Sequence, residues 1–267
     1  MARTKHGPPV PGVYRRPPHR TVNVPAKARP PRRRAYVIAG IAVAVALGLM
    51  AGSVLSARGG DDTGSSAPPA GAEVFGADVV ETLFAGIPQG GNALGDPGAP
   101  VTLVEYADLQ CPFCAQWAAR TLPDLVEDYV RSGDLRIEFR GMAFIGEDSE
   151  TALRAALAAG EQDRLWNFVD LLYLNQGAEN GGWVSADLLA AIGRSVPGLD
   201  GGLVEQRMGS SEVTNALQAH GDAAAAAGIT GTPSFELGRT GGSLERLEVG
   251  SLDADEFRAA IDELLGR

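Results

Sequence analysis

The sequence predicts an α/β domain that carries an inserted run of helices and is preceded by one transmembrane helix. Two segments, Val101–Tyr106 and Leu135–Phe139, have the apolar patterning of strands and enclose a helical segment, which makes a βαβ unit. Residues 149–228 are then patterned as helix almost throughout. Upstream, Tyr36–Leu55 contains no charge and has about the length of helix that crosses a bilayer.

Charge is distributed unevenly along the 267 residues. Residues 1–58 carry 11 Lys and Arg and no acid, whereas the remainder carries 12 cations against all 33 acids, a net charge near -21. Phosphate binding needs clustered cations on the folded part of a protein, and here the cations lie in the tail. We therefore expect no nucleic-acid binding by the main domain.

The N-terminal region is predicted to anchor the chain in a membrane. Residues 1–34 are rich in Pro and Arg and poor in apolar residues, which predicts a disordered cytoplasmic tail. Residues 35–56 form the predicted anchor, and Arg32–Arg34 before it keep the tail inside by the positive-inside rule. A cleaved signal peptide and a twin-arginine export signal are the alternatives, and each places the C-terminal domain outside the cytoplasm.

Residues 57–75 are predicted to be a flexible linker, and residues 76–266 the folded domain. The helix expected over Pro112–Arg131 should be kinked by Pro123, which lacks a backbone donor. The helical insertion is predicted at about 147–228, where Gly228 is a typical helix end. A hairpin and a closing amphipathic helix follow, over Ser234–Leu237, Leu244–Val249 and Asp253–Leu265.

The two cysteines of the chain lie in Gln110-Cys111-Pro112-Phe113-Cys114, where a strand gives way to a helix. At the start of a helix, unpaired backbone amides and the helix dipole favour a thiolate, so Cys111 is predicted to attack in disulfide exchange. Cys114 lies one turn further on and is the natural resolving thiol. Pro112 suits the first helical position, because its missing N–H would have had no partner there.

Glu105 lies in the middle of the first strand, on the same face as Val101 and Leu103. If this face is buried, the pKa of the Glu105 carboxyl rises, and the carboxyl becomes able to exchange a proton with Cys114. The alternative is a Glu at an exposed edge or in an ion pair, and the pattern alone leaves both open.

These motifs resemble the thioredoxin superfamily, and the helical insertion resembles its DsbA-like branch. The similarity covers roughly residues 76–266, and the segment from Gly95 to Cys114 resembles the membrane-anchored DsbA-like proteins of Gram-positive bacteria, including actinobacteria. The resemblance implies a redox-active disulfide between Cys111 and Cys114, with Cys111 as nucleophile and Glu105 as buried acid, and it implies no cofactor.

The resemblance also implies a substrate-binding region around the cysteines. Thr232-Pro233 matches the cis-proline loop of the family, and a cis bond would bring the backbone of Thr232 beside the cysteines to pair with an extended substrate. Pro112 and Phe113 belong to the same region. The DsbA proteins of Gram-negative bacteria carry a His between the cysteines, whereas Phe113 can stabilise a thiolate by neither charge nor hydrogen bonding. We therefore expect a less oxidising couple.

The function expected from these features is thiol–disulfide exchange outside the cytoplasm, most simply the introduction of disulfides into exported proteins by a monomer. A DsbB-like or VKOR-like membrane protein would then reoxidise it, as the resemblance implies. A reductase or an isomerase of the same fold remains an alternative, and so does a binding or chaperone module with a structural disulfide. A zinc site is disfavoured because tetrahedral zinc needs four N or S ligands, and outside the tail only His220, expected to be solvated or capping, is left to join the cysteines.

Overall fold

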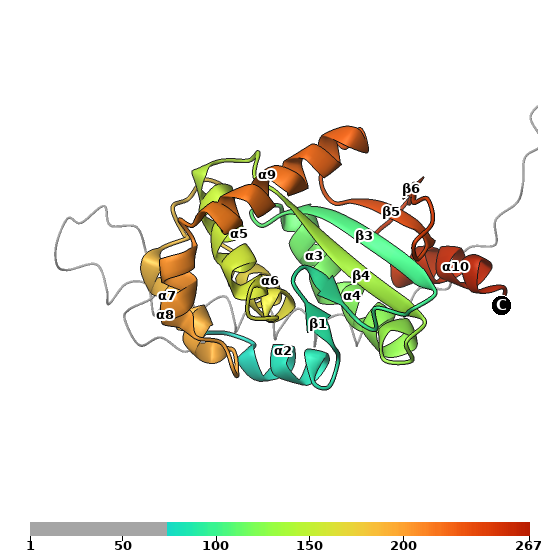
Figure 1. Cartoon of the computed structure of the whole chain (residues 1–267), viewed down its shortest axis with the longest axis horizontal. Helices are drawn as coiled ribbons and strands as arrows, with labels where there is room; N and C mark the ends of the chain where they lie inside the picture. The colour runs from blue at the N-terminus through green and yellow to red at the C-terminus, as the bar shows by residue number, and fades with distance from the viewer. Residues whose placement is uncertain (1–73) are drawn as a thin grey trace, which may run out of the picture. The chain divides into compact units, whose positions relative to one another are not determined.

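The computed structural model describes residues 74–267, which are built around a six-stranded mixed sheet (Figure 1). The strand order is β1-β2-β4-β3-β5-β6. At its centre, β3 (Val101–Asp108) and β4 (Leu135–Met142) pair in parallel along their whole length, as predicted for the βαβ unit. The other strands pair antiparallel: β1 (Gln89–Gly90), β2 (Ala93–Leu94), β5 (Ser234–Arg239) and β6 (Glu245–Leu247).

The helical connection from β3 to β4 has three parts rather than one kinked helix. They are α3 (Pro112–Arg120), α4 (Leu122–Leu125) and the π-helical turn η1 (Val126–Val130). The interruption falls at Thr121, two residues before Pro123. Pro123 is thus in the first turn of α4, where a missing backbone N–H costs no helical hydrogen bond.

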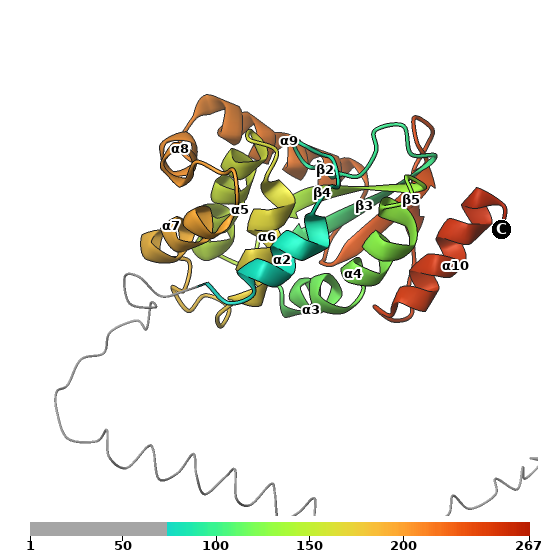
Figure 2. The same ribbon diagram turned by 90° about the horizontal axis from the view of Figure 1, so that it is seen from below.

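Helices cover both faces of the sheet (Figure 2). On one face lie α3, α4 and α10 (Ala254–Leu265), and Trp117 of α3 packs against Phe235 of β5 and Phe257 of α10 at ring-centroid distances of 5.3 and 6.0 Å. On the opposite face lies α9 (Ser211–Ala226), whose Ala224 packs with Val104 and Tyr106 of β3. The central strand is therefore buried along all of its length.

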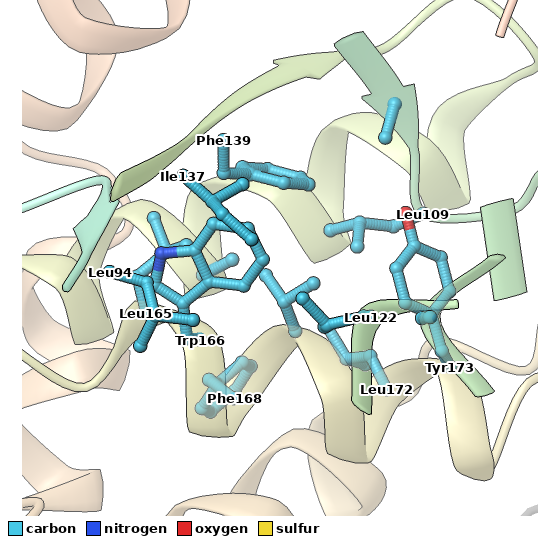
Figure 3. Close-up of a cluster of buried hydrophobic side chains, with 14 of the residues drawn as sticks. Leu94, Leu109, Leu122, Ile137, Phe139, Leu165, Trp166, Phe168, Leu172 and Tyr173 are labelled. Carbon is cyan, nitrogen blue, oxygen red and sulfur yellow. The ribbon is translucent and has the colours of Figure 1, made fainter. Parts of the chain in front are cut away.

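The helical insertion contains α5 (Glu147–Gly160), α6 (Leu165–Leu174), α7 (Ala186–Ser195) and α8 (Gly201–Arg207). Its helical character confirms the sequence prediction, although α8 was not predicted, because its Gly-Gly start hides the periodicity. In α6 nine of ten residues are buried. Figure 3 shows Trp166 and Tyr173 of this helix directed toward the sheet, with Trp166 beside Phe139 of β4 at 6.1 Å between ring centroids.

The segment before the first long strand is also structured. The sequence predicted none of α2 (Ala77–Phe84), β1 and β2, because these elements are too short to show a period. No helix within residues 74–267 is long and apolar enough to cross a membrane. The predicted tail, the anchor at residues 35–56 and most of the linker lie outside the described residues.

Both edges of the sheet are short. β1 has two residues, and β6 has three, of which Glu245 and Arg246 are exposed. Arg246 forms an ion pair of 2.9 Å with Glu248, so charges of both signs border this edge.

His220 of α9 differs from its sequence prediction. It is 5% exposed rather than solvated, and its Nδ1 accepts a hydrogen bond of 3.0 Å from the backbone N–H of Gly141. Burial, together with the charge of Arg140, lowers the pKa of its imidazole to about 4. Because a neutral imidazole can accept at Nδ1 while a charged one cannot, the fold holds His220 neutral.

We predict a loss of stability in acid that depends on His220. The folded pKa is below the unfolded value, so the contribution of neutral His220 is complete above about pH 6.5 and is lost as the pH falls toward 4, about 2 kcal/mol by pH 4.5. Urea unfolding at several pH values should show a smaller acid loss in His220→Gln than in wild type. Parallel pH profiles would contradict this assignment.

Candidate active site

The two cysteines lie at the junction between β3 and α3. Cys111 is the residue that caps α3, with extended backbone angles, and Pro112 is the first helical residue, as the sequence predicted. Cys111 is 5% exposed and Cys114 is fully buried, and both are free thiols in this structure. One turn of helix therefore separates a thiol near the surface from a thiol beneath it.

A second loop, from the far end of the domain sequence, closes over Cys111. The Thr232-Pro233 peptide bond is cis, and the Sγ of Cys111 lies 3.4 Å from the carbonyl oxygen of Thr232. Phe113 projects from the same region with 60% of its surface exposed. The residues that the sequence singled out around the cysteines thus lie together, with an exposed aromatic ring next to the thiols.

The electrostatics of the two thiols are opposite. The pKa of Cys111 is lowered to about 6, first by a hydrogen bond from the Cys114 thiol, and further by Thr232 and the backbone N–H groups of Cys114 and Phe113, while burial opposes the shift. The backbone amides expected from the helix start contribute, but the neighbouring thiol contributes more. Cys111 therefore carries a thiolate near neutral pH.

Cys114 is held in its protonated form. Burial raises the pKa of this thiol well above the ordinary value, and the hydrogen bond that it gives to Cys111 and the charge of Glu105 raise it further. A thiol in this position can attack or leave only if a nearby group takes or gives a proton. The site consequently needs a proton-transfer group below Cys114.

Glu105 is a buried acid whose charge acts on Cys114. Its side chain is 1% exposed, and its Oε1 is buried without a hydrogen-bond partner within residues 74–267. Burial raises the pKa of this carboxyl well above the ordinary value, and the charges of Asp170 and Cys111 add to the effect. Of the two possibilities left open by the sequence, the structure therefore has the buried acid without an ion pair in the described part of the chain.

Asp108 was not predicted to belong to the site, yet this residue holds the turn that carries Cys111. Its Oδ1 accepts hydrogen bonds from the N–H of Gln110 at 2.9 Å and the hydroxyl of Ser149 at 2.6 Å. Its Oδ2 accepts from the N–H groups of Phe144 and Ile145 at 3.1 and 3.2 Å, and its carbonyl accepts from the N–H of Cys111 at 2.9 Å. The signal in the sequence is an acid that closes a buried strand immediately before the cysteines.

Further contacts tie the same turn to the helical insertion. The Gln110 amide accepts from the N–H of Asn180 at 2.6 Å and donates to Ser149 at 2.9 Å. The Gln176 amide donates to the carbonyls of Leu109 and Cys111 at 2.9 and 3.3 Å. The insertion is therefore one wall of the site. No group of three or more His, Cys, Asp or Glu in residues 74–267 is arranged to hold a metal ion.

This chain is similar in sequence to known proteins. A family model described as thioredoxin matches residues 89–263. The probable disulfide bond formation protein D of Bacillus cereus is 31% identical over 177 residues, covering 65% of this chain and 78% of that protein. The disulfide bond formation protein D of Bacillus subtilis is 24% identical over 182 residues, covering 67% and 79%.

A solved structure shows the same fold. The crystal structure of oxidised BdbD from Bacillus subtilis superimposes with a TM-score of 0.59 at 22% sequence identity, and the match covers 68% of this chain and 99% of that chain.

We predict selective alkylation of Cys111. Iodoacetamide reacts with thiolates, so the rate of modification of the reduced protein should rise with pH through a midpoint near 6 and should be confined to Cys111 at pH 7. Cys111→Ser should react only at strongly alkaline pH. Cys114→Ala should keep a reactive Cys111 but with a higher midpoint, because the thiol that hydrogen-bonds to it is removed. Equal labelling of both cysteines at pH 7 would be incompatible with the site as described.

Proposed function

The chain belongs to the thioredoxin family and, within it, to the DsbA-like thiol–disulfide oxidoreductases, and from this premise we propose that it introduces disulfides into exported proteins through Cys111 and Cys114. The observation that carries the proposal is the opposite state of the two thiols, one favoured as a thiolate and the other as a buried, protonated thiol. That asymmetry supports Cys111 as the sulfur that forms the mixed disulfide with the substrate, and Cys114 as the thiol that leaves and takes up a proton.

In the proposed reaction the enzyme begins with a Cys111–Cys114 disulfide. A substrate thiolate attacks the sulfur of Cys111, the bond between the cysteines breaks, and Cys114 leaves with the electron pair and takes up a proton. A second substrate thiolate then attacks the substrate sulfur of the mixed disulfide. The substrate gains a disulfide, Cys111 leaves as a thiolate, and the enzyme is left with two electrons.

The lowered pKa of Cys111 supports oxidation as the direction. A stabilised thiolate stabilises the reduced enzyme relative to its disulfide, which makes the disulfide more oxidising. The Bacillus relatives are named disulfide bond formation protein D, which points the same way. The reductase, isomerase and purely structural alternatives have no such support.

The roles of the surrounding residues are part of the proposal. Glu105 would supply the proton that Cys114 takes up, because it is the buried acid whose charge acts on that thiol. The backbone of Thr232, next to Pro233, would pair with an extended substrate segment, and Pro112 and Phe113 would contact it.

The cellular setting proposed here rests on the sequence. Residues 35–56 would anchor a monomer in the cell membrane, with residues 1–34 in the cytoplasm and the domain of residues 76–266 outside. A membrane protein of the DsbB-like or VKOR-like kind would accept the two electrons and restore the disulfide. No cofactor is needed, since the cysteines carry the electrons themselves.

Cys114→Ser should trap the first intermediate. Without the resolving thiol, Cys111 remains joined to substrates, so mixed disulfides with exported cysteine-containing proteins should accumulate and disappear on reduction. Cys111→Ser, matched in size and chemistry, should trap none. If both variants are equally free of adducts when isolated from cells under thiol-blocking conditions, the proposed function is wrong.

Phe113→His should make the couple more oxidising. The exposed phenyl ring can neither charge-pair with nor donate to the Cys111 sulfur, whereas an imidazolium can do both, which would lower the pKa of Cys111 further. Equilibration with glutathione should give a potential higher by tens of millivolts, about 30 mV for each tenfold change in the equilibrium constant. Phe113→Leu is the control and should leave the potential close to that of wild type.

A further inference from the structure

Asp170 is a buried acid that takes no part in the reaction steps proposed above. It lies in α6 with 6% of its surface exposed, and its carboxyl has no hydrogen bond or ion pair within residues 74–267. Its neighbours along the helix, Val169 and Leu171, are buried and apolar. Burying a carboxyl without a partner costs several kcal/mol if it is charged, so a fold that keeps one calls for an explanation.

The position of Asp170 on its helix directs it toward the sheet. Trp166, Asp170 and Tyr173 are spaced at i, i+4 and i+7, so they lie on one face of α6. The first packs against Phe139 of β4, and the hydroxyl of the last donates to the Asp108 carbonyl of β3 at 3.4 Å. Figure 3 shows both of these flanking side chains directed toward the strands.

Glu105 is the strand residue that meets this face. It pairs in register with Phe139 across the parallel ladder, so the two side chains lie next to each other on the same side of the sheet. Trp166 packs against Phe139, and Asp170 is one turn further along the same face of α6, which places it on the side of the sheet that carries Glu105. The charge of Asp170 acts on the Glu105 carboxyl more strongly than that of Cys111 does.

Within residues 74–267, charges on the elements around this pair are all negative or remote. Asp108 of β3, Cys111, Cys114 of α3 and Tyr173 of α6 are the other titratable groups on this side. Arg136 and Arg140 of β4 lie on the opposite face, where Arg140 acts on His220, and β5 contributes the apolar Phe235. The charged side chains of α2 and α7 reach solvent, and on α5 the Oδ2 of the acid Asp148 is buried without a hydrogen-bond partner within residues 74–267.

We propose that Asp170 is a positioning residue for the exchange reaction: its negative charge keeps Glu105 protonated, so that Glu105 holds the proton that the leaving Cys114 sulfur takes up. Two carboxyls in one low-dielectric layer repel each other when both are ionised, so near neutral pH they share a single charge. Asp170 is the more exposed of the two, and its pKa, raised by burial, is about 7. It therefore ionises first.

The reaction step is balanced on this assignment, which rests on the proposed function. When the Cys111–Cys114 bond breaks, the proton of the Glu105 carboxyl moves to the Cys114 sulfur, and a pair of adjacent carboxylates is left. The strain of that pair is relieved when a proton from solvent returns, entering at Asp170. Asp170 therefore keeps the Glu105 carboxyl protonated at the pH at which substrate thiols are sufficiently ionised to attack.

The test is the order in which the two carboxyls ionise in the full chain. With ¹³C-labelled Asp and Glu carboxyls, wild type should show Asp170 titrating near pH 7 while Glu105 stays protonated to higher pH. In Asp170→Asn the Glu105 midpoint should fall by about one pH unit or more, because the repelling charge is gone. Asp187→Asn, an exposed Asp of the same insertion, is the matched control and should leave Glu105 unchanged.

A kinetic readout links the pair to the cysteines. The rate at which dithiothreitol opens the disulfide of the oxidised protein should fall as the pH rises and the Glu105 carboxyl loses its proton. In Asp170→Asn this fall should occur at a lower pH, by the same shift as the Glu105 midpoint. An unchanged Glu105 midpoint in the folded variant, or Glu105 ionising before Asp170 in wild type, would overturn the proposal. The wild-type order decides the question if the variant does not fold. Failure of Cys114→Ser to trap substrates would instead refute the proposed function and leave the carboxyl titrations as they are.

Discussion

The carboxyl group of Asp108 is completely buried, and the arrangement of the site depends on the four donors that surround it. Two come from backbone N–H groups after β4, one from the start of α5 and one from the turn that leads to Cys111. Hydrogen bonds to a charged acceptor contribute roughly 1.5–3 kcal/mol each, which offsets much of the cost of burial. The same contacts fix where β3 ends, where α3 begins and where the insertion meets both.

The opposite pKa shifts of the Cys111 and Cys114 thiols follow from that fixed turn. Because Cys111 caps the helix and Cys114 lies one turn inward, one sulfur can receive hydrogen bonds from several donors while the other is surrounded by apolar side chains and carboxyls. Low dielectric strengthens the interactions of both. Within residues 74–267 the buried layer beneath them contains acids and no cation on the same side, which favours the proposed proton transfer over ion pairing there.

Much of this organisation could be predicted from the sequence, because it depends on the pattern of neighbouring residues. The strand before the cysteines, the helix after them and the helical character of the insertion each follow from periodicity, and Pro112 at the helix start follows from its missing donor. Contacts between distant segments could not be predicted. The environment of His220 depends on Gly141, and the role of Asp170 depends on which way α6 is turned. Even so, one acid in the run LWNFVDLLYL is a visible anomaly, since apolar helices seldom keep an unpaired charge.

The short, charged borders of the sheet have a consequence for a protein whose proposed partners are unfolded chains. Unfolded polypeptides carry unpaired backbone groups and readily add to any open strand, which begins aggregation. Here one border offers only two residues, and the other presents Glu245 and Arg246 beside Glu248, which disfavour such an addition. If the proposed partners are such chains, these borders disfavour their addition to the sheet and leave the loop beside Cys111 as the place where the domain would hold them, for as long as one covalent bond lasts.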